Sequence, residues 1–440
     1  MKHFDVLVVG GGPAGSMAAA GVLKANPQAV VGLVDPDSDV SHRIGEALLT
    51  GTIMSLQDAG LDGAVADAGF HHKVGAAYVW GESREPWYVN YPRLDDDAYP
   101  VRFKDTTGYR RSIHVARDKF DPILRREVEK RGVEIVRSKI RTVKTTDTKD
   151  GPAIVSVVTD GGETITAKRF IDASGHAHAL ARHVTKRQAV GAPRIARYAY
   201  TPAVDWAMAE RCGFDAHRTN IVSNANGWFW AIHLGEAGDG LTSLGFVSTP
   251  EIASKLTFDN CTGAFPELKA FGFKDGYLAP STFDGVPAAA FYGHPDYSFA
   301  CERLHGANWS LSGDAAMFID PILSQGVTLA VHYGFGRGLA AAAELHGDAT
   351  AQEKVTENYR REGAILRLVV GEWYGNNRAV DDWRMKSVMV SKDLFGEDLD
   401  PVTAFRYVTN LENLRHDYDP YPEEERRHIW KKLGVAPSAL

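Results

Sequence analysis

The first 35 residues constrain the fold more than any other part of the chain. An apolar run over residues 6–9 leads directly into Gly10-Gly11-Gly12-Pro13-Ala14-Gly15, and a second apolar run ends on Asp35. Gly10 permits a tight turn, Gly12 lets backbone amides approach a pyrophosphate, and Gly15 lets the following helix pack close to the sheet. Asp35, at the tip of the second strand, is placed to accept hydrogen bonds from a ribose. This pattern predicts a strand–helix–strand unit that binds a dinucleotide.

The composition is typical of a globular enzyme with two to three domain-sized units. The chain has 440 residues, of which 44% are hydrophobic and 24% charged, and its net charge is -7. The negative charge argues against a nucleic-acid partner. No apolar stretch approaches the roughly twenty residues that span a bilayer, and the N-terminus begins with a strand instead of a cleavable signal, so we expect a cytoplasmic protein. Cys212, Cys261 and Cys301 lack the spacing of metal ligands or of a disulfide framework, and we expect no metal.

Periodicity divides the rest of the chain into helical and extended segments. Helices are predicted over residues 46–59, 120–130 and 325–345, and strands over 76–80, 87–91, 111–115, 134–136, 154–158, 170–172, 228–232, 241–247 and 309–312. We expect an α/β fold in which a Rossmann-like FAD-binding domain is discontinuous. Its predicted parts are residues 1–190 and 300–345, with a β-rich substrate domain inserted over 191–299 and a helical C-terminal region over 346–440.

Three strand ends punctuated by glycine favour FAD over NAD as the dinucleotide. The first is the turn at 10–15. The second is Asp172-Ala173-Ser174-Gly175, and the third is Gly313-Asp314-Ala315-Ala316, which follows an apolar strand and opens a helix. A flavin dinucleotide needs contacts along its pyrophosphate and ribityl chain, and Asp314 can accept hydrogen bonds from ribityl hydroxyls. No second nucleotide fingerprint for NAD(P)H is found.

The order of motifs across nearly the whole chain resembles the flavin-dependent halogenases, a branch of the FAD-dependent monooxygenase superfamily. Lys73, the Trp228/Trp230 pair and the turn at 324–326 are the parts typical of halogenases. His233 stands where the tryptophan element of the family ends in proline, and Gln325 stands where some members carry serine or threonine. The motifs are residues 10–16 (GGGPAGS), 43–49 (RIGEALL), 70–77 (FHHKVGAA), 114–121 (HVARDKFD), 171–175 (IDASG), 227–232 (GWFWAI) and 313–327.

The resemblance implies a flavin domain of the type found in p-hydroxybenzoate hydroxylase and a halogenation reaction. FADH2 and oxygen would give a C4a-hydroperoxide, and a chloride or bromide ion would attack its distal oxygen. The hypohalous acid formed would reach Lys73, which directs it to an electron-rich aromatic ring. A backbone nest at Gln325-Gly326 would hold the halide. Trp228 and Trp230, on one face of a strand, would keep the substrate away from the flavin.

The implied site residues fall into three groups. The catalytic residue is Lys73. The residues that would contact substrate or halide are Trp228, Trp230, Pro321, Ser324, Gln325 and Gly326. The residues that would bind FAD are Gly10, Gly12, Pro13, Ala14, Gly15, Asp35, Arg43, Glu46, Arg117, Asp172, Gly313, Asp314, Gly326 and Val327.

The resemblance also implies partners. A separate flavin reductase would deliver FADH2, and the substrate would be a phenol, a pyrrole or a similar ring, free or tethered to a carrier protein, instead of free tryptophan. Two alternatives stay open: an FAD monooxygenase that hydroxylates its substrate without Lys73, and a reductase of the geranylgeranyl type with a long apolar tunnel. In the C-terminal region, Trp373, Tyr374 and Trp383 either cap the substrate pocket or pack between helices. His71, His72 and His114 could exchange the ring proton, although lone histidines are more often structural.

Overall fold

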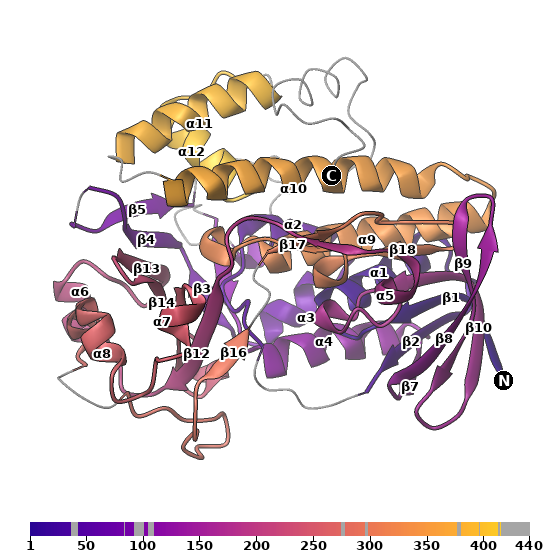
Figure 1. The fold of residues 1–440 in the computed structure, drawn as a ribbon, viewed down its shortest axis with the longest axis horizontal. Helices are drawn as coiled ribbons and strands as arrows, with labels where there is room; N and C mark the ends of the chain where they lie inside the picture. Colours follow the sequence, from indigo (N-terminus) through magenta and orange to yellow (C-terminus); the bar gives the residue numbers. More distant parts are fainter. Residues whose placement is uncertain are drawn as a thin grey trace.

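The glycine turn lies at the edge of a sheet assembled from distant parts of the chain (Figure 1). Among the described residues this sheet has seven strands, and its central strand β1 pairs in parallel with β2 and β10, while β18 pairs in parallel with β10. The computed structural model describes residues 1–36, 43–82, 84–91, 101–103, 110–273, 278–294, 298–375, 380–395, 397–411 and 414. The strands are β7 (Glu134–Arg137), β2 (Val31–Asp35), β1 (Lys2–Val9), β10 (Thr164–Asp172), β9 (Gly151–Thr159), β8 (Ile140–Thr148) and β18 (Trp309–Leu311).

The parallel register brings the three glycine-punctuated strand ends to one edge. Val9 pairs with Val34 of β2 and with Asp172 of β10, and Asp172 in turn pairs with Leu311 of β18. The carboxyl ends of neighbouring parallel strands are where open α/β sheets bind their ligands. The register therefore places residues 10–15, 173–175 and 313–314 side by side, although the chain separates them widely.

Helices α1 (Pro13–Ala25) and α9 (Gly326–Leu345) pack together beside this sheet (Figure 1). A Cβ atom on Gly338 of α9 would lie 2.0 Å from the backbone oxygen of Ala18 in α1, which no real side chain can occupy. Glycine at this contact lets the two helix backbones approach more closely than larger residues would allow. Helix α1, the first of the chain, is thus packed against a helix that begins about 300 residues later, at Gly326.

A second sheet, also seven-stranded among the described residues, forms the other half of the molecule. It is antiparallel except where β13 pairs in parallel with β4. Two of its strands, β4 and β5, come from the segment that the sequence pattern assigns to the FAD-binding part. Its strands, in order, are β16 (Tyr292–His294), β12 (Ile195–Thr201), β15 (Thr242–Ser248), β14 (Gly227–His233), β13 (Arg218–Asn224), β4 (Gly75–Val79) and β5 (Trp87–Asn90).

Shorter elements surround the two sheets. Strand β3, which directly precedes β4 in the chain, forms an antiparallel pair with β6, which follows β5, and a three-stranded sheet joins β11, β17 and β19 among the described residues. These elements are β3 (His71–Lys73), β6 (Ser112–His114), β11 (Arg187–Ala189), β17 (Phe299–Cys301), β19 (Met317–Phe318), α2 (Thr50–Asp58), α3 (Asp62–Asp67), α4 (Arg117–Lys130), α5 (Ala181–Val184), α6 (Trp206–Arg211), α7 (Pro250–Ala253) and α8 (Cys261–Ala264).

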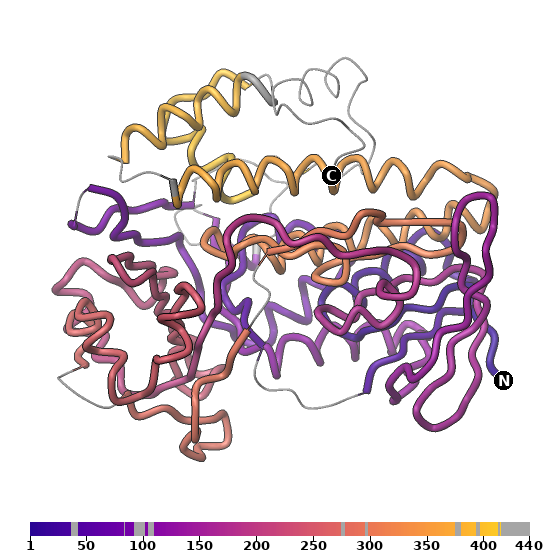
Figure 2. The backbone as a smooth tube through the Cα atoms, viewed as in Figure 1, coloured from indigo at the N-terminus to yellow at the C-terminus, as the bar shows by residue number. Residues whose placement is uncertain are grey.

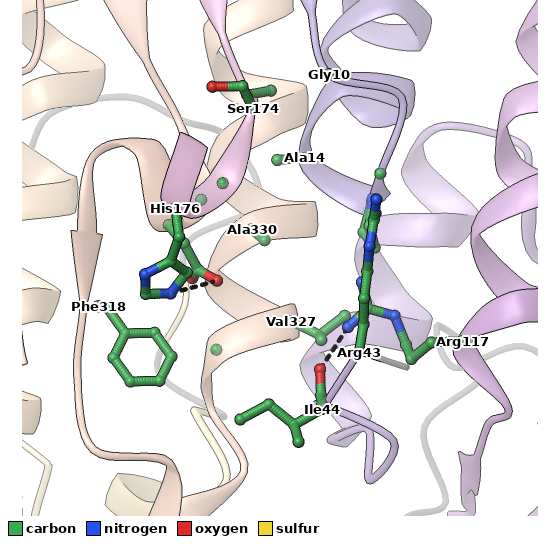
Figure 3. A pocket seen from close by; sticks show the side chains of 18 of the residues that line it. Gly10, Ala14, Arg43, Ile44, Arg117, Ser174, His176, Phe318, Val327 and Ala330 are labelled. Atoms are coloured by element: carbon green, nitrogen blue, oxygen red, sulfur yellow. Dashed lines mark hydrogen bonds and ion pairs between the residues drawn. The ribbon is translucent and has the colours of Figure 1, made fainter. Parts of the chain in front are cut away.

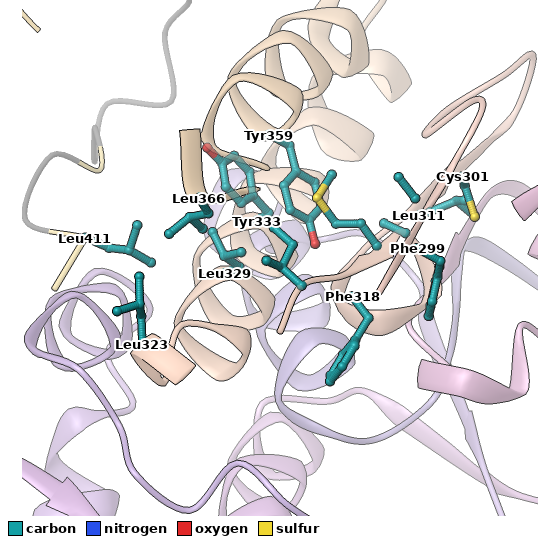
Figure 4. Close-up of a cluster of buried hydrophobic side chains, with 14 of the residues drawn as sticks. Phe299, Cys301, Leu311, Phe318, Leu323, Leu329, Tyr333, Tyr359, Leu366 and Leu411 are labelled. Atoms are coloured by element: carbon teal, nitrogen blue, oxygen red, sulfur yellow. The ribbon is translucent and has the colours of Figure 1, made fainter. Parts of the chain in front are cut away.

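The described part of the C-terminal region is helical, and residues 415–440 of it lie outside the described residues. Helix α10 (Ala351–Gly375) packs along α9 and runs along the long axis of the molecule (Figures 1 and 2). Tyr333 of α9 and Tyr359 of α10 stack with their ring centroids 4.1 Å apart, within the apolar cluster in Figure 4. Helices α11 (Val380–Phe395) and α12 (Pro401–Thr409) follow. No helix in the described part of the chain has the length and apolar character needed to span a membrane.

Candidate cofactor, halide and lysine site

A cavity of about 640 Å³ lies between the carboxyl edge of the first sheet and the inner face of the second. Figure 3 shows Arg43 and Arg117 on one side of it and His176 with Phe318 on the other. The structure brings most of the sequence-predicted binding residues to its wall. These are Gly10, Gly12, Pro13, Ala14, Asp35, Arg43, Glu46, Arg117, Gly313, Asp314, Pro321, Ser324, Gly326, Val327, Trp228 and Trp230.

The glycine turn has the shape that a pyrophosphate requires. Gly10 has φ of +105°, and a Cβ there would lie 2.3 Å from the backbone oxygen of Ala173. At Gly12, at the N-terminus of α1, an added Cβ would make ordinary contacts with the side chains of Arg43 and Asp121, the nearer at 3.6 Å. Gly15 lies behind the turn, where a Cβ would meet the oxygen of Gly10 at 1.8 Å. Uncapped amides and the helix dipole favour an anion at this position, so these residues fit the diphosphate of FAD.

The carboxylates of two acidic residues at the strand ends bind to other groups of the protein. Asp35 lines the cavity, but one carboxylate oxygen accepts from Gly11 N at 2.5 Å and the other pairs with Arg125 at 3.1 Å. Asp172 is fully buried and does not line the cavity. Its oxygens accept from the Ser174 backbone and hydroxyl, and from two further amides at 2.7 Å. Asp172 therefore shapes the turn that follows it, and its role in binding FAD stays a prediction.

Glu46 is a buried carboxyl that ties the cavity floor to the second sheet. It accepts hydrogen bonds from the Tyr200 hydroxyl at 3.1 Å and the Ser243 hydroxyl at 3.0 Å. Ser243 in turn accepts from the indole N–H of Trp230 at 3.0 Å. Burial raises the pKa of Glu46, and the nearby Arg117 guanidinium opposes that rise. Glu46 thus fixes the orientation of one of the two predicted wall residues.

The turn before α9 forms an anion-binding shape at the cavity wall. Ser324 has φ of +59° and is followed by Gln325 in the right-handed region, an alternation that turns successive N–H groups toward one point. A Cβ on Gly326 would meet nothing within 4 Å, so the first residue of the 20-residue helix borders open space. The side chain of Gln325 does not line the cavity; its amide donates to the Asp320 backbone oxygen at 2.6 Å. The backbone here, and not the glutamine side chain, is suited to a halide.

Trp228 is tied to the C-terminal region. Its indole N–H donates to the Tyr374 hydroxyl at 2.5 Å, and that hydroxyl donates to Asp320 at 2.6 Å. Burial raises the pKa of Asp320 to about 6. The guanidinium carbon of Arg194 lies 3.7 Å from the centre of the Tyr374 ring. The sequence pattern suggested that Tyr374 either caps a pocket or packs between helices, and these contacts show that it braces the tryptophan wall.

Lys73 lies on β3, behind the cavity wall, with 1% of its surface exposed. No hydrogen bond or ion pair involves its ammonium among the residues that the structure describes; its Nζ lies 5.8 Å from the centre of the Tyr91 ring. Burial lowers the pKa of Lys73 to about 7. In the β3–β6 pair Lys73 lies opposite Ser112, whose hydroxyl is buried without a partner. Lys73 and Ser112 are therefore two neighbouring polar groups buried together on one face of this pair.

Sequence reasoning missed several residues of the site. His176 lines the cavity and its Nε2 lies 3.5 Å from Asp314; its place directly after the 172–175 motif is the signal that could have found it. Thr219 also lines the wall. The contact of His71 with His217, whose ring centroids are 4.4 Å apart, has no sequence signal because the fold alone joins these positions.

Comparisons with known proteins agree on one family. The model described as tryptophan halogenase matches residues 5–111 and 102–414. The chain is 29% identical over 386 residues to a tryptophan 2-halogenase of Chondromyces crocatus, covering 84% of this chain and 68% of that protein. It is 26% identical over 343 residues to the 1H-pyrrole-2-carbonyl (peptidyl-carrier protein) chlorinase of Pseudomonas fluorescens, covering 75% and 73%.

The fold is shared with solved structures of the same kind. The myxobacterial chondrochloren halogenase CndH, an FAD-dependent halogenase, superimposes with a TM-score of 0.71 at 24% identity, over 100% of this chain and 99% of that one. The flavin-dependent brominase Bmp2 superimposes with a TM-score of 0.69 at 22% identity, over 98% of this chain and 99% of that one. The predicted α/β fold with a Rossmann-like FAD domain and a helical C-terminal region is therefore confirmed.

Proposed function

The chain belongs to the tryptophan halogenase family, and we propose on this premise that it chlorinates or brominates a phenol, a pyrrole or a similar electron-rich ring beside Lys73. Flavin-dependent halogenases are oxidoreductases that use FAD and a halide ion, and this chain halogenates an aromatic substrate. The observation that supports the assignment to Lys73 is its buried ammonium, which has no hydrogen-bond or ion-pair partner among the described residues and a pKa lowered to about 7.

In this proposal different residues of the cavity bind the cofactor and the halide. We assign the FAD diphosphate to the glycine turn and the N-terminus of α1, and the ribityl chain to Asp314. Bound as FADH2, the cofactor supplies with oxygen the oxidising power that turns halide into hypohalous acid. The nest at 324–326 holds the halide, and Trp228 with Trp230 closes the wall so that the small oxidant passes and the aromatic substrate does not.

Lys73 is suited to the oxidant in either protonation state. As an ammonium it donates a hydrogen bond to the oxygen of hypohalous acid and makes the halogen more electrophilic. As an amine it can take the halogen itself as a chloramine or bromamine, and the lowered pKa populates this form near neutrality. Arginine cannot replace it in this second role because a guanidinium stays protonated.

The partners follow from the reaction and from the relatives. A separate flavin reductase supplies FADH2. The name of the Pseudomonas fluorescens relative specifies a pyrrole bound to a peptidyl carrier protein, which supports testing tethered as well as free rings here. In this proposal residues 1–190 and 300–345 bind FAD, residues 191–299 form most of the substrate side, and residues 346–440 brace it.

The test supplies FADH2 from an unrelated flavin reductase, together with oxygen and either chloride or bromide, to phenols and pyrroles both free and carrier-bound. We expect halogenated product from the wild type, none from Lys73→Ala, and wild-type yield from Lys144→Ala, which changes an exposed lysine on β8. Hydroxylated product that forms without halide would show a monooxygenase instead. Rapid reduction of FAD by NADPH with this protein alone would overturn the need for a separate reductase.

A further inference from the structure

Four imidazoles, which we call the histidine cluster, gather beside Lys73: His71 on β3, His114 on β6, His217 before β13 and His233 on β14. The ring centroid of His71 lies 4.4 Å from that of His217, 4.9 Å from that of His233 and 6.0 Å from that of His114. His114 is fully buried, His71 and His233 are half-buried, and His217 is exposed. The cluster therefore extends from solvent to the interior next to the lysine.

The strand register places Lys73 and His114 together. β3 and β6 pair so that His71 faces His114 and Lys73 faces Ser112. Alternate residues of a strand share a face, so the side chains of all four lie on one face of the pair. The positive charge of Lys73 contributes to lowering the pKa of His114, after burial itself. The two groups are thus close enough that one is disfavoured as a cation when the other carries the charge.

Hydrogen bonds fix which nitrogen of His114 carries the hydrogen of the neutral ring. Its Nδ1 lies 3.0 Å from the backbone oxygen of His233. A carbonyl oxygen only accepts, so Nδ1 carries the hydrogen and Nε2 of the neutral ring keeps its lone pair. That Nε2 lies 3.4 Å from the hydroxyl of Thr219, which lines the cofactor cavity. The lone pair of His114 is therefore directed toward the cavity wall.

The surroundings keep His114 neutral and ready to accept a proton. The groups that face it are Lys73 and His71 on β3, His233 on β14, and His217 beyond His71. All of them are bases, and each would oppose a second positive charge. Burial lowers the pKa of His114 well below its ordinary value. A proton received there is held weakly and passes on to the nearest stronger base.

We infer that His114 is a proton-transfer residue of the proposed halogenation, which takes the proton that the aromatic ring loses and returns it to Lys73. The ring carbon bonds to the halogen as the halogen–oxygen bond of hypohalous acid breaks, and the oxygen leaves as water with a proton from the Lys73 ammonium. The ring C–H bond then breaks, and its electron pair restores the aromatic ring. The proton moves from the ring carbon to Nε2 of His114 and then to the Lys73 amine, so no proton is gained or lost over the cycle.

The inference rests on the proposed function, and a pair of variants separates the two. In His114→Asn the side-chain amide nitrogen can keep the bond to the His233 oxygen, while the base is removed. We expect kcat for ring halogenation to fall by about 10²-fold, the lower range for lost acid–base catalysis. In this variant a ring-deuterated substrate should react more slowly than the protonated one, whereas we expect no isotope effect in the wild type. His332→Asn, a buried histidine on α9 outside the cluster, controls for the loss of an imidazole.

A second measurement follows the oxidant without the ring. A small diketone that traps hypohalous acid should be halogenated at the same rate by His114→Asn and by the wild type, because the cofactor cavity is unchanged. If the wild type halogenates neither ring nor trap, the proposed function fails, and this inference with it. If the wild type halogenates rings and His114→Asn matches it without an isotope effect, only this inference fails.

A third measurement needs no turnover. Nitrogen-15 NMR of the histidine rings should show His114 neutral at pH 7 with its hydrogen on Nδ1. In Lys73→Met the pKa of His114 should rise, because the nearby positive charge is gone. A hydrogen on Nε2, or a His114 pKa that is unchanged in Lys73→Met, would overturn the inference.

Discussion

Replacing Lys73 with methionine should stabilise the protein, because burial makes the ammonium costly. Burial lowers the pKa of Lys73 from 10.5 to about 7 in the folded state. The folded protein therefore binds this proton more weakly than the unfolded chain does, and its stability rises as the pH increases from about 7 to 10.5. Each tenfold change in proton affinity is worth about 1.4 kcal/mol, so the penalty at pH 7 is about 4 kcal/mol. Methionine fills a similar volume without a charge.

The assay is urea unfolding of the protein without added FAD, followed by tryptophan fluorescence at several pH values from 6 to 10. For the wild type, the free energy of unfolding should rise across this range. Lys73→Met should unfold at higher urea at pH 7 and show a flatter pH profile, whereas Lys144→Met, at an exposed position, should follow the wild type. A Lys73→Met protein that is less stable than the wild type at pH 7 would refute the reasoning, since the ammonium would then be making favourable contacts.

Three further changes test the cavity. Gly10→Ala should abolish FAD binding, measured by flavin fluorescence quenching, because the new Cβ would lie 2.3 Å from a backbone oxygen. Glu46→Ala should lower the free energy of unfolding by about 1–3 kcal/mol because it removes the buried acceptor of the Tyr200 and Ser243 hydroxyls, while Glu46→Gln, which keeps an acceptor, should lower it less. Tyr374→Phe leaves Asp320 without its hydroxyl donor and should raise the protease sensitivity of the C-terminal helices; unchanged cleavage would contradict the bracing role.

The sequence predicts best where the signal is local. The turn at 10–15 and the motif at 313–316 identify themselves by glycines in fixed order after apolar runs, and both line the cavity. Asp172 shows the limit of such motifs. The sequence places it at the right strand end, but whether its carboxylate faces a ligand or its own turn depends on amides at 180 and 181, which fold back onto it.

The surroundings of Lys73 could not be read in the same way. Its burial depends on the pairing of β3 with β6, which brings Ser112 opposite it across a long sequence separation. The arrangement of the second sheet could not be predicted from sequence either, since no local pattern indicates that β4 pairs in parallel with β13. The resemblance to halogenases predicts a role for Lys73, whereas its place beside the histidine cluster follows from tertiary structure alone.

The packing of α9 against α1 also determines how late in translation the flavin domain can complete its fold. A chain leaving the ribosome presents the glycine turn first, yet the helix that covers α1 ends only at residue 345. Until then the face of α1 that packs against Gly338 has no partner from α9, and closing such a long loop costs entropy that local contacts cannot offset. Stable flavin loading should therefore come late in synthesis. A nascent chain stopped before α9 should be a target for chaperones and proteases and should not be a partly active enzyme.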